Sequence, residues 1–173
     1  MIRRIIKEFR SRADRERSQE RYLVLRDLFD QSLSLKEETD IEIDTTSSEL
    51  NRIRIEYRRK SADVSQNRDM GESLTRRKEL QDLKDQMDSL DKKEAILFAK
   101  RAILKDVINL INFFLKNLER VSRSSLSTES DAELDIKLSV LEGYLHEESL
   151  ILDSAFDPEF ANKIRNLRKI IFS

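Results

Sequence analysis

The chain has 173 residues, of which 33 are Lys or Arg and 34 are Asp or Glu, so charged side chains make up 39% of it. That share is well above the roughly 25% of ordinary globular domains, and one proline and two glycines leave long stretches free to form helices. The absence of cysteine excludes disulfides, thiolate zinc sites, iron–sulfur clusters and thiol nucleophiles. Composition therefore favours a helical protein that works without cysteine chemistry.

The first 21 residues predict a basic amphipathic helix followed by a charged spacer, because 14–21 contains no apolar side chain. Four large apolar residues fall on one helical face, flanked by arginines and lysines: Ile2, Ile5, Ile6 and Phe9. Since nothing nearby in the sequence would cover this face, we expect it to bind a partner protein or to complete an oligomer. The alternative is a peripheral membrane protein, anchored on an anionic surface through residues 1–13.

Residues 46–94 predict an antiparallel coiled-coil arm. A capping-box pattern at Thr46 to Glu49 marks the start of its first helix, after a predicted linker at 39–48. A second, longer helix is predicted from about Leu74 to Ser122. Folding back about Met70, with Gly71 in the turn, pairs apolar seam positions in register: Leu50 with Leu90, Ile53 with Met87, Tyr57 with Leu83, and Lys60 with Leu80. The same seam also suits an arm that swaps between chains.

Residues 22–45 and 95–173 predict a small helical bundle. From Ile96 onward the long helix gains a second apolar stripe, and a face this wide needs several neighbouring helices. After a second linker at 122–130, a leucine stripe marks a helix over about 131–154. Asp157 before Pro158 marks the cap and first turn of a last helix. The predicted fold class is all-α: a small helical bundle with a long antiparallel coiled-coil arm, or helical hairpin.

Residues that could carry catalysis or bind a metal are scarce. His146 is the only imidazole, whereas a di-iron bundle site needs a Glu-x-x-His pair from each of two helices. We interpret it as a surface histidine paired with Glu142 or as a partly buried one. One histidine and two separated glycines also leave no catalytic triad and no phosphate-binding loop. We therefore expect no enzyme, no cofactor and no metal site.

Basic side chains gather on the predicted arm, which makes a nucleic-acid-binding accessory protein an alternative. The hairpin register brings two basic runs toward the arm tip as a phosphate-binding patch: Arg52, Arg54, Arg58, Arg59, Arg76 and Arg77. Against it, the whole chain carries a net charge of -1 and no known nucleic-acid motif. Nucleic acid is therefore not the favoured partner.

Charge alternates in blocks along the chain, a pattern that suits pairing between segments or chains. Residues 1–26 hold nine basic and four acidic side chains, whereas 124–159 holds one basic and ten acidic. Charges interrupt the apolar zones and no secretory signal is recognisable, so we expect a soluble, intracellular and cytoplasmic protein. The predicted function is a non-catalytic scaffold, adaptor or assembly subunit that acts through coiled-coil protein contacts, as a homo-oligomer or as part of a complex.

Overall fold

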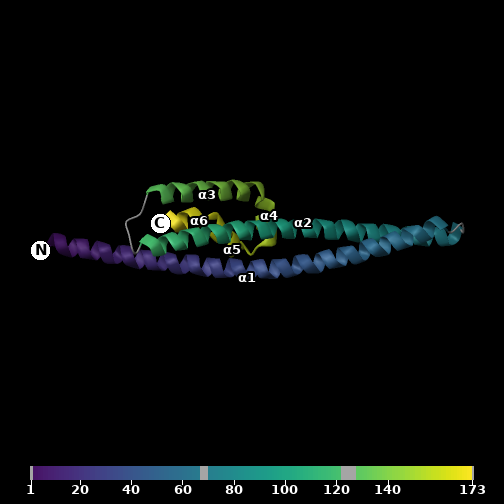
Figure 1. The fold of residues 1–173 in the computed structure, drawn as a ribbon, viewed down its shortest axis with the longest axis horizontal. Helices are drawn as coiled ribbons and strands as arrows, with labels where there is room; N and C mark the ends of the chain where they lie inside the picture. The colour runs from purple at the N-terminus through teal and green to yellow at the C-terminus, as the bar shows by residue number, and fades with distance from the viewer. Residues whose placement is uncertain (1, 67–69, 122–127, 173) are drawn as a thin grey trace. The chain divides into compact units, whose positions relative to one another are not determined.

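The computed structural model is all-α in the residues that it describes, which are 2–66, 70–121 and 128–172 for the backbone and 19–63, 74–116 and 132–172 for side chains. The helices are α1 (Ile2–Gln66), α2 (Met70–Val121), α3 (Thr128–Glu147), α4 (Ser149–Ala155), α5 (Pro158–Arg165) and α6 (Leu167–Phe172) (Figure 1). α1 and α2 pack against each other. The predicted fold class, an all-α protein with a helical hairpin, is confirmed.

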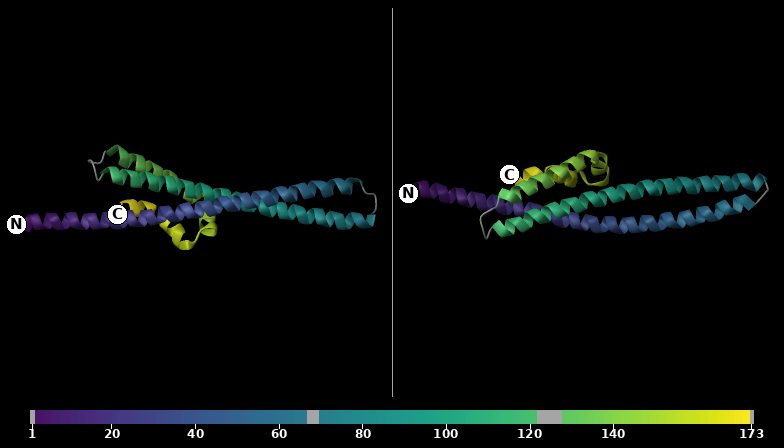
Figure 2. Two further views of the ribbon diagram at one scale, coloured as in Figure 1. Left: turned by 60° about the horizontal axis from the view of Figure 1, so that its bottom comes forward. Right: turned by 45° about the horizontal axis from the view of Figure 1, so that its top comes forward.

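The chain divides into two compact units. The bundle unit comprises 1–36 and 102–173, and the hairpin unit comprises 37–101. In the bundle unit, α3 turns back along the end of α2, and the short helices α4 to α6 complete the packing (Figure 2). Each unit is described separately below.

The core of the bundle unit is one cluster of buried apolar side chains drawn from all six helices. From α1 it takes Leu25 and Leu28, both fully buried, with Tyr22, Phe29 and Leu35 packed against them. The two apolar stripes predicted on α2 are both buried here: Ile103, Val107, Leu110 and Phe114 on one, and Leu104, Ile111 and Leu115 on the other. The wide face of α2 is therefore covered by several helices, as its pattern predicted.

In the hairpin unit, α1 and α2 lie side by side and antiparallel, and each buries a narrow seam (Figure 1). The buried or half-buried seam residues of α1 are Thr39, Ile43, Thr46, Leu50, Ile53, Tyr57 and Lys60. Those of α2, in the order of the predicted register, are Arg101, Leu97, Glu94, Leu90, Met87, Leu83 and Leu80. The spacing of three and four residues is that of a coiled coil.

Ion pairs between the two helices fit the predicted register of the hairpin. Arg54 Nη2 lies 2.9 Å from Asp91 Oδ1, and Lys60 Nζ lies 3.0 Å from Glu79 Oε2. Nearer the other end of the unit, Lys93 Nζ lies 2.9 Å from a Glu42 oxygen. All of these side chains are more than a third exposed, so the pairs contribute to alignment more than to stability.

The linker predicted at 39–48 is wrong, and so is the helix start at Thr46, because α1 continues without a break through both. The reason is the seam: Thr39, Ile43 and Thr46 are all buried against α2. The hydroxyl next to the predicted cap bonds within the existing helix, since Thr45 Oγ1 donates to the Ile41 carbonyl at 2.9 Å. Local signals for a linker and a helix cap are therefore overridden by packing.

The predicted turn at Gly71 is also misplaced, because this residue belongs to the first turn of α2. The connection between the two long helices, 67–69, lies outside the described residues. Most of the second predicted linker, 122–130, lies outside them as well, and α3 already includes Thr128.

The C-terminal segment forms shorter helices than its pattern predicted. The helix predicted over 131–154 is interrupted at Glu148, and the last helix is interrupted at Asn166. The predicted cap is confirmed, since Asp157 Oδ2 accepts hydrogen bonds from the backbone N–H groups of Glu159 at 3.1 Å and Phe160 at 3.2 Å. These short helices gain their stability from burial of Leu152, Phe160, Ile164, Leu167 and Ile171 rather than from length.

Candidate functional site

The apolar face predicted at the N-terminus belongs to α1, whose backbone is helical from Ile2. The side chains of Ile2, Ile5, Ile6 and Phe9 lie outside the described residues. The first described contact on this part of α1 is made by Arg21, whose Nη1 donates to the Ile171 carbonyl at 3.1 Å. Partner binding by the four apolar side chains stays a prediction.

The six arginines predicted as a phosphate site differ in what they contact. Arg54 is paired with Asp91, and Arg52 Nη2 lies 3.9 Å from a Glu49 oxygen. Arg58, Arg59 and Arg77 are exposed and make no ion pair within the described part of the chain, whereas Arg76 is half-buried. The register offsets the two basic runs by more than one helical turn. The hairpin therefore presents separate cations along its length.

The structure places His146 on the exposed surface of α3. Its predicted partner Glu142 is engaged instead by Arg168, whose Nε donates to Glu142 Oε1 at 2.8 Å. Among the described residues, no group of three His, Asp or Glu side chains is arranged to hold a metal ion. In the same part of the chain, no helix is both long and apolar enough to cross a membrane.

The most distinctive surface of the bundle unit is a groove between α2 and α3. It holds a cavity of about 290 Å³, lined by Asp106, Asn109 and Leu110 of α2 and by Ile136, Lys137, Val140 and Leu141 of α3. Ile136 is 64% exposed and Val140 is 69% exposed. Their neighbours Leu110 and Leu141 are buried in the core, so the groove floor continues into the apolar interior.

Exposure of two β-branched apolar side chains on one helical face is unusual for a helix that already has a buried stripe. The core stripe of α3 consists of Leu134, Leu138, Leu141 and Leu145. Ile136 and Val140 form a second face, four residues apart, and Gly143 continues it with open space around its Cα. An apolar strip beside a small residue is a surface against which another helix can pack closely.

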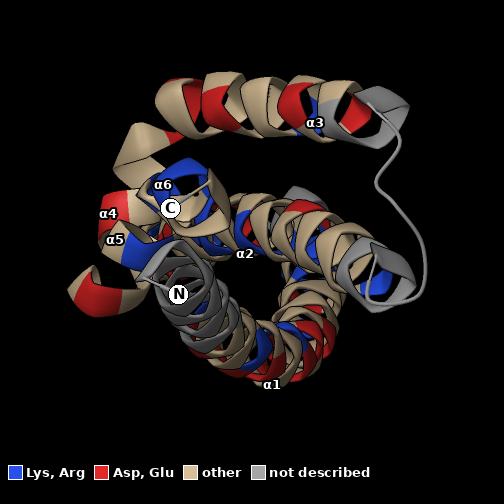
Figure 3. Ribbon diagram, turned by 90° about the vertical axis from the view of Figure 1, so that its left-hand side faces the viewer, with Lys and Arg blue, Asp and Glu red and all other residues tan. Residues whose placement is uncertain are grey.

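Acidic side chains border this groove. Asp106 lines it, and Glu133 and Glu147 share the α3 face with Ile136 and Val140 at helical spacing. Lys137 partly offsets them, because its Nζ lies 3.4 Å from a Glu133 oxygen and 5.2 Å from the centre of the Phe113 ring. α3 as a whole carries six acidic side chains and one lysine, and Figure 3 shows in red the acidic residues in the described part of this helix.

The ionisation of Tyr144 reflects the same negative field. Burial raises the pKa of its phenol, and the charges of Glu148 and Asp106 raise it further. A phenolate at this position would be both desolvated and repelled by these two carboxylates.

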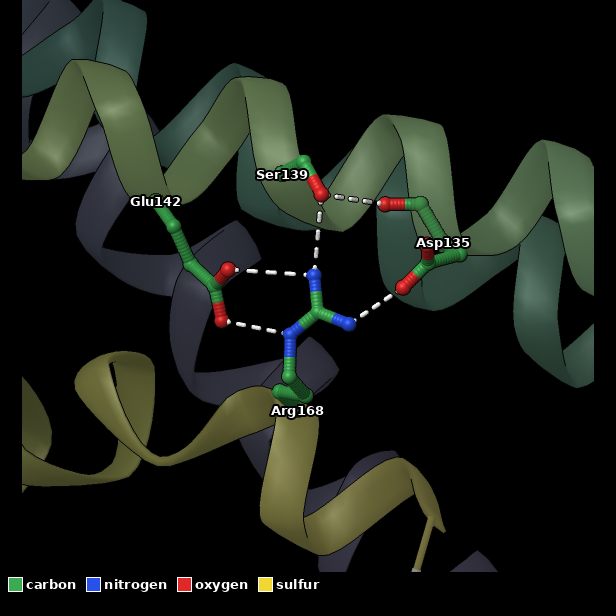
Figure 4. Close-up of polar contacts among 4 residues, drawn as sticks. All are labelled: Asp135, Ser139, Glu142 and Arg168. Atoms are coloured by element: carbon green, nitrogen blue, oxygen red, sulfur yellow. Dashed lines mark hydrogen bonds and ion pairs between the residues drawn. The ribbon is translucent and has the colours of Figure 1, made fainter.

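Two further acids of α3, Asp135 and Glu142, lie on another face of the helix and are already paired. Arg168 of α6 binds both oxygens of Glu142, at 2.8 and 3.1 Å, and also contacts Asp135 and the Ser139 hydroxyl (Figure 4). These bonds raise the pKa of its guanidinium, first through Glu142 and then through Asp135. This network joins α3 to α6, whereas on the groove face Lys137 is the one basic side chain, and it pairs with Glu133.

Comparison of the sequence with family models and with curated proteins, and of the structure with solved structures, gives no match. The chemistry of the groove is therefore the basis for a functional interpretation.

Sequence reasoning missed the groove. The signal was present, because Ile136 and Val140 stand four residues apart and outside the leucine stripe of α3. Periodicity alone assigned them no neighbour, and only the position of α2 shows that they border a cavity.

Proposed function

We propose that this protein is a non-catalytic scaffold or assembly subunit that self-associates through helix-to-helix contacts at the α2–α3 groove. The observation that supports the proposal is the exposure of Ile136 and Val140 beside a cavity that is also lined by the core residues Leu110 and Leu141. Large apolar side chains that border a depression and are rimmed by charge are typical of protein-binding surfaces. An intracellular, cytoplasmic location is part of the same proposal.

The mode of binding is the packing of an amphipathic helix into a groove. The exposed strip on α3 runs from Ile136 to Gly143, which is about two helical turns. A partner helix that presents apolar residues at the same spacing would cover the strip and exclude water from it. Burying Ile136 and Val140 in this way would supply the apolar centre of the contact, and the acidic rim would select the partner.

The proposal is tested by the mass of the full chain in solution, measured by light scattering after size exclusion. The unmodified protein is expected at a multiple of 20.5 kDa, the mass of one chain. Val140→Asp is expected to weaken self-association by about tenfold or more, because it places a charge at the centre of the contact. Leu150→Asp is the matched control, since Leu150 of α4 is even more exposed and lies outside the groove lining.

Two results would contradict the proposal. One is a monomeric unmodified protein across the accessible concentration range. The other is an equal loss of association in the Val140 and Leu150 variants, which would show that the groove has no special part. Circular dichroism of both variants checks that helix content is unchanged.

Phosphate binding on the hairpin is a second candidate function, favoured by the exposed Arg58, Arg59 and Arg77, which have no ion pair among the described residues. Such cations would bind nucleic acid with an affinity that falls steeply with salt. The test is a titration of labelled single-stranded RNA and duplex DNA at two salt concentrations, repeated with Arg58, Arg59, Arg76 and Arg77 changed to Glu. Binding that does not depend on salt or on these arginines would exclude this function.

A further inference from the structure

The proposed function requires a helix that binds in the groove. The first part of α1 is a segment of this chain with matching charge and apolar pattern. α2 ends at Val121, and the first turns of α1 extend past that end of α2 (Figure 1). The C-terminal helix α6 ends nearby, since the Ile171 carbonyl accepts a hydrogen bond from Arg21. α1 begins at Ile2, well before both of these points. The first turns of α1 thus precede Arg21, at which α6 contacts this helix.

The charge of this segment is opposite to that of the groove. Residues 1–13 contain five basic side chains and one acidic side chain. The groove is lined by Asp106 and Lys137, and Glu133 and Glu147 share the α3 face of Ile136 and Val140 at helical spacing, so three carboxylates accompany one lysine there, which pairs with Glu133. Attraction between the two would orient the segment as it approaches.

The apolar pattern of the segment also matches the groove. At helical spacing, Ile2, Ile5, Ile6 and Phe9 share one face, between Arg3, Arg4, Lys7 and Arg10. The exposed strip of Ile136 and Val140 is a complementary surface of about the same length. We infer that the groove between α2 and α3 binds the N-terminal helix, residues 2–13, of a second copy of this chain.

The occupant is a second copy because α1 is one unbroken helix from Ile2 to Gln66. To reach α3 of its own chain, the segment would have to leave that helix and reverse direction, which would break backbone hydrogen bonds of α1. The N-terminal segment of a second copy can bind the groove while its own α1 stays an unbroken helix. This inference rests on the proposed function and identifies the partner that the groove takes.

Site-directed crosslinking tests the contact, because the chain has no cysteine of its own. One preparation carries Ile5→Cys and another, of different size through a tag, carries Val140→Cys. Mixed and oxidised, they are expected to form a covalent heterodimer. Ile5→Cys leaves three of the four apolar anchors in place, and Val140→Cys changes the size of its side chain only slightly.

Two matched controls define the background. Ser11→Cys replaces a residue on the opposite face of the same helix, and Leu150→Cys places a thiol on α4, outside the groove lining. Crosslinking of Ile5→Cys with Val140→Cys is expected to exceed both control pairs severalfold. Equal yields would overturn the inference, and so would an intrachain disulfide in a monomeric Ile5→Cys/Val140→Cys double variant.

Charge reversal gives an independent test that does not depend on thiol geometry. Changing Arg3, Arg4 and Lys7 to Glu is expected to weaken self-association roughly tenfold, the combined effect of several exposed ion pairs. Changing Asp106, Glu133 and Glu147 to Lys should do the same. Mixing the two reversed chains restores association if they meet at this contact, and failure to restore it would overturn the inference.

The outcomes separate this inference from the proposed function. An oligomer in which the Ile5–Val140 crosslink does not exceed the controls would keep self-assembly and exclude the N-terminal helix as the occupant. A monomeric unmodified protein would exclude both. Binding of the monomer to phosphatidylserine vesicles, lost in the Arg3/Arg4/Lys7→Glu variant, would assign the segment to a membrane surface instead and would also overturn the inference.

Discussion

The bundle unit and the hairpin unit share two helices, α1 and α2, yet they bury them differently. In the bundle, α2 buries two adjacent stripes against several neighbours, and residues such as Leu104, Val107 and Ile111 are fully buried. In the hairpin, each helix buries one residue every three or four positions, and several of these are polar. The width of the apolar face therefore determines how many neighbours a helix segment takes, even when the helix itself is continuous.

The polar seam residues of the hairpin show what a narrow interface accepts. Thr39 and Thr46 are buried, and Glu94 lies in the seam, where it accepts a hydrogen bond from the Ser47 hydroxyl. Polar residues in a coiled-coil seam reduce stability while they favour one alignment of the two helices. We therefore expect the hairpin to be the less stable unit and its register to be well defined.

The largest expected effect tests this difference with matched leucines. Leu104→Ala in the bundle should lower the free energy of unfolding by about 3 kcal/mol, because a fully buried side chain leaves a cavity among several helices. Leu83→Ala in the hairpin should cost about half of that, since Leu83 is 8% exposed and has one neighbouring helix. Urea unfolding gives the energies, and hydrogen exchange shows which unit opens. Equal losses would contradict the comparison.

The cap of α5 gives a smaller effect within the bundle. Asp157→Ala removes the side chain that accepts hydrogen bonds from the amides of Glu159 and Phe160, and should cost about 1 kcal/mol. Asp157→Asn is the control, because asparagine caps helices almost as well. Thermal unfolding of the two variants should therefore separate them, and a similar loss in both would point to the charge rather than the cap.

In the hairpin we expect one substitution to raise the free energy of unfolding. Glu94→Leu replaces a polar seam residue by an apolar one and should raise stability by about 1 kcal/mol. The register should become less well defined at the same time. In a Leu50→Cys/Leu90→Cys background, the fraction of intrachain disulfide measures this directly, and it should fall when Glu94 is replaced. An unchanged fraction would show that Glu94 has no part in the register.

The smallest effect concerns alkaline pH. The hydrogen bond from Lys60 to Glu79 raises the pKa of this lysine above its usual 10.5. The folded state therefore binds the proton more tightly than the unfolded chain, so the stabilisation is complete below about that pH and is lost as the pH rises through the folded-state pKa. Hairpin stability measured between neutral and alkaline pH should decline less in Lys60→Met than in the unmodified protein. Parallel curves would exclude a contribution from this pair.

The fold was predictable where a pattern repeated, and was mispredicted where a local signal competed with packing. Four seam pairs, beginning with Leu50 and Leu90, indicated the hairpin register, and Asp157 before Pro158 indicated the last cap. The linker at 39–48 was mispredicted because threonines, serines and aspartates resemble a loop until their place in the seam is recognised. Burial of Ile43 against α2 outweighs those preferences.

The candidate site was less predictable than the fold for a physical reason. A groove depends on two helices at once, so Asp106 and Val140 acquire a common role only when α3 lies along α2. The breaks at Glu148 and Asn166 were hidden for a similar reason, because each lies within a continuous apolar pattern and follows from how the short helices pack. The N-terminal apolar face, by contrast, was visible in the sequence. The crosslinking experiments test whether this face binds the groove of a second copy.

The hydrogen bond between Arg21 and the Ile171 carbonyl joins residues 150 positions apart, and it has a consequence for the order in which the protein folds during synthesis. The ion pair of Lys60 with Glu79 spans 19 positions, so hairpin contacts can form once their short stretch of chain has left the ribosome. The bundle must wait until residue 171 has been made. In the interval, the apolar stripes of α2 are exposed to water. At this stage the newly made chain aggregates, or binds a chaperone, most readily.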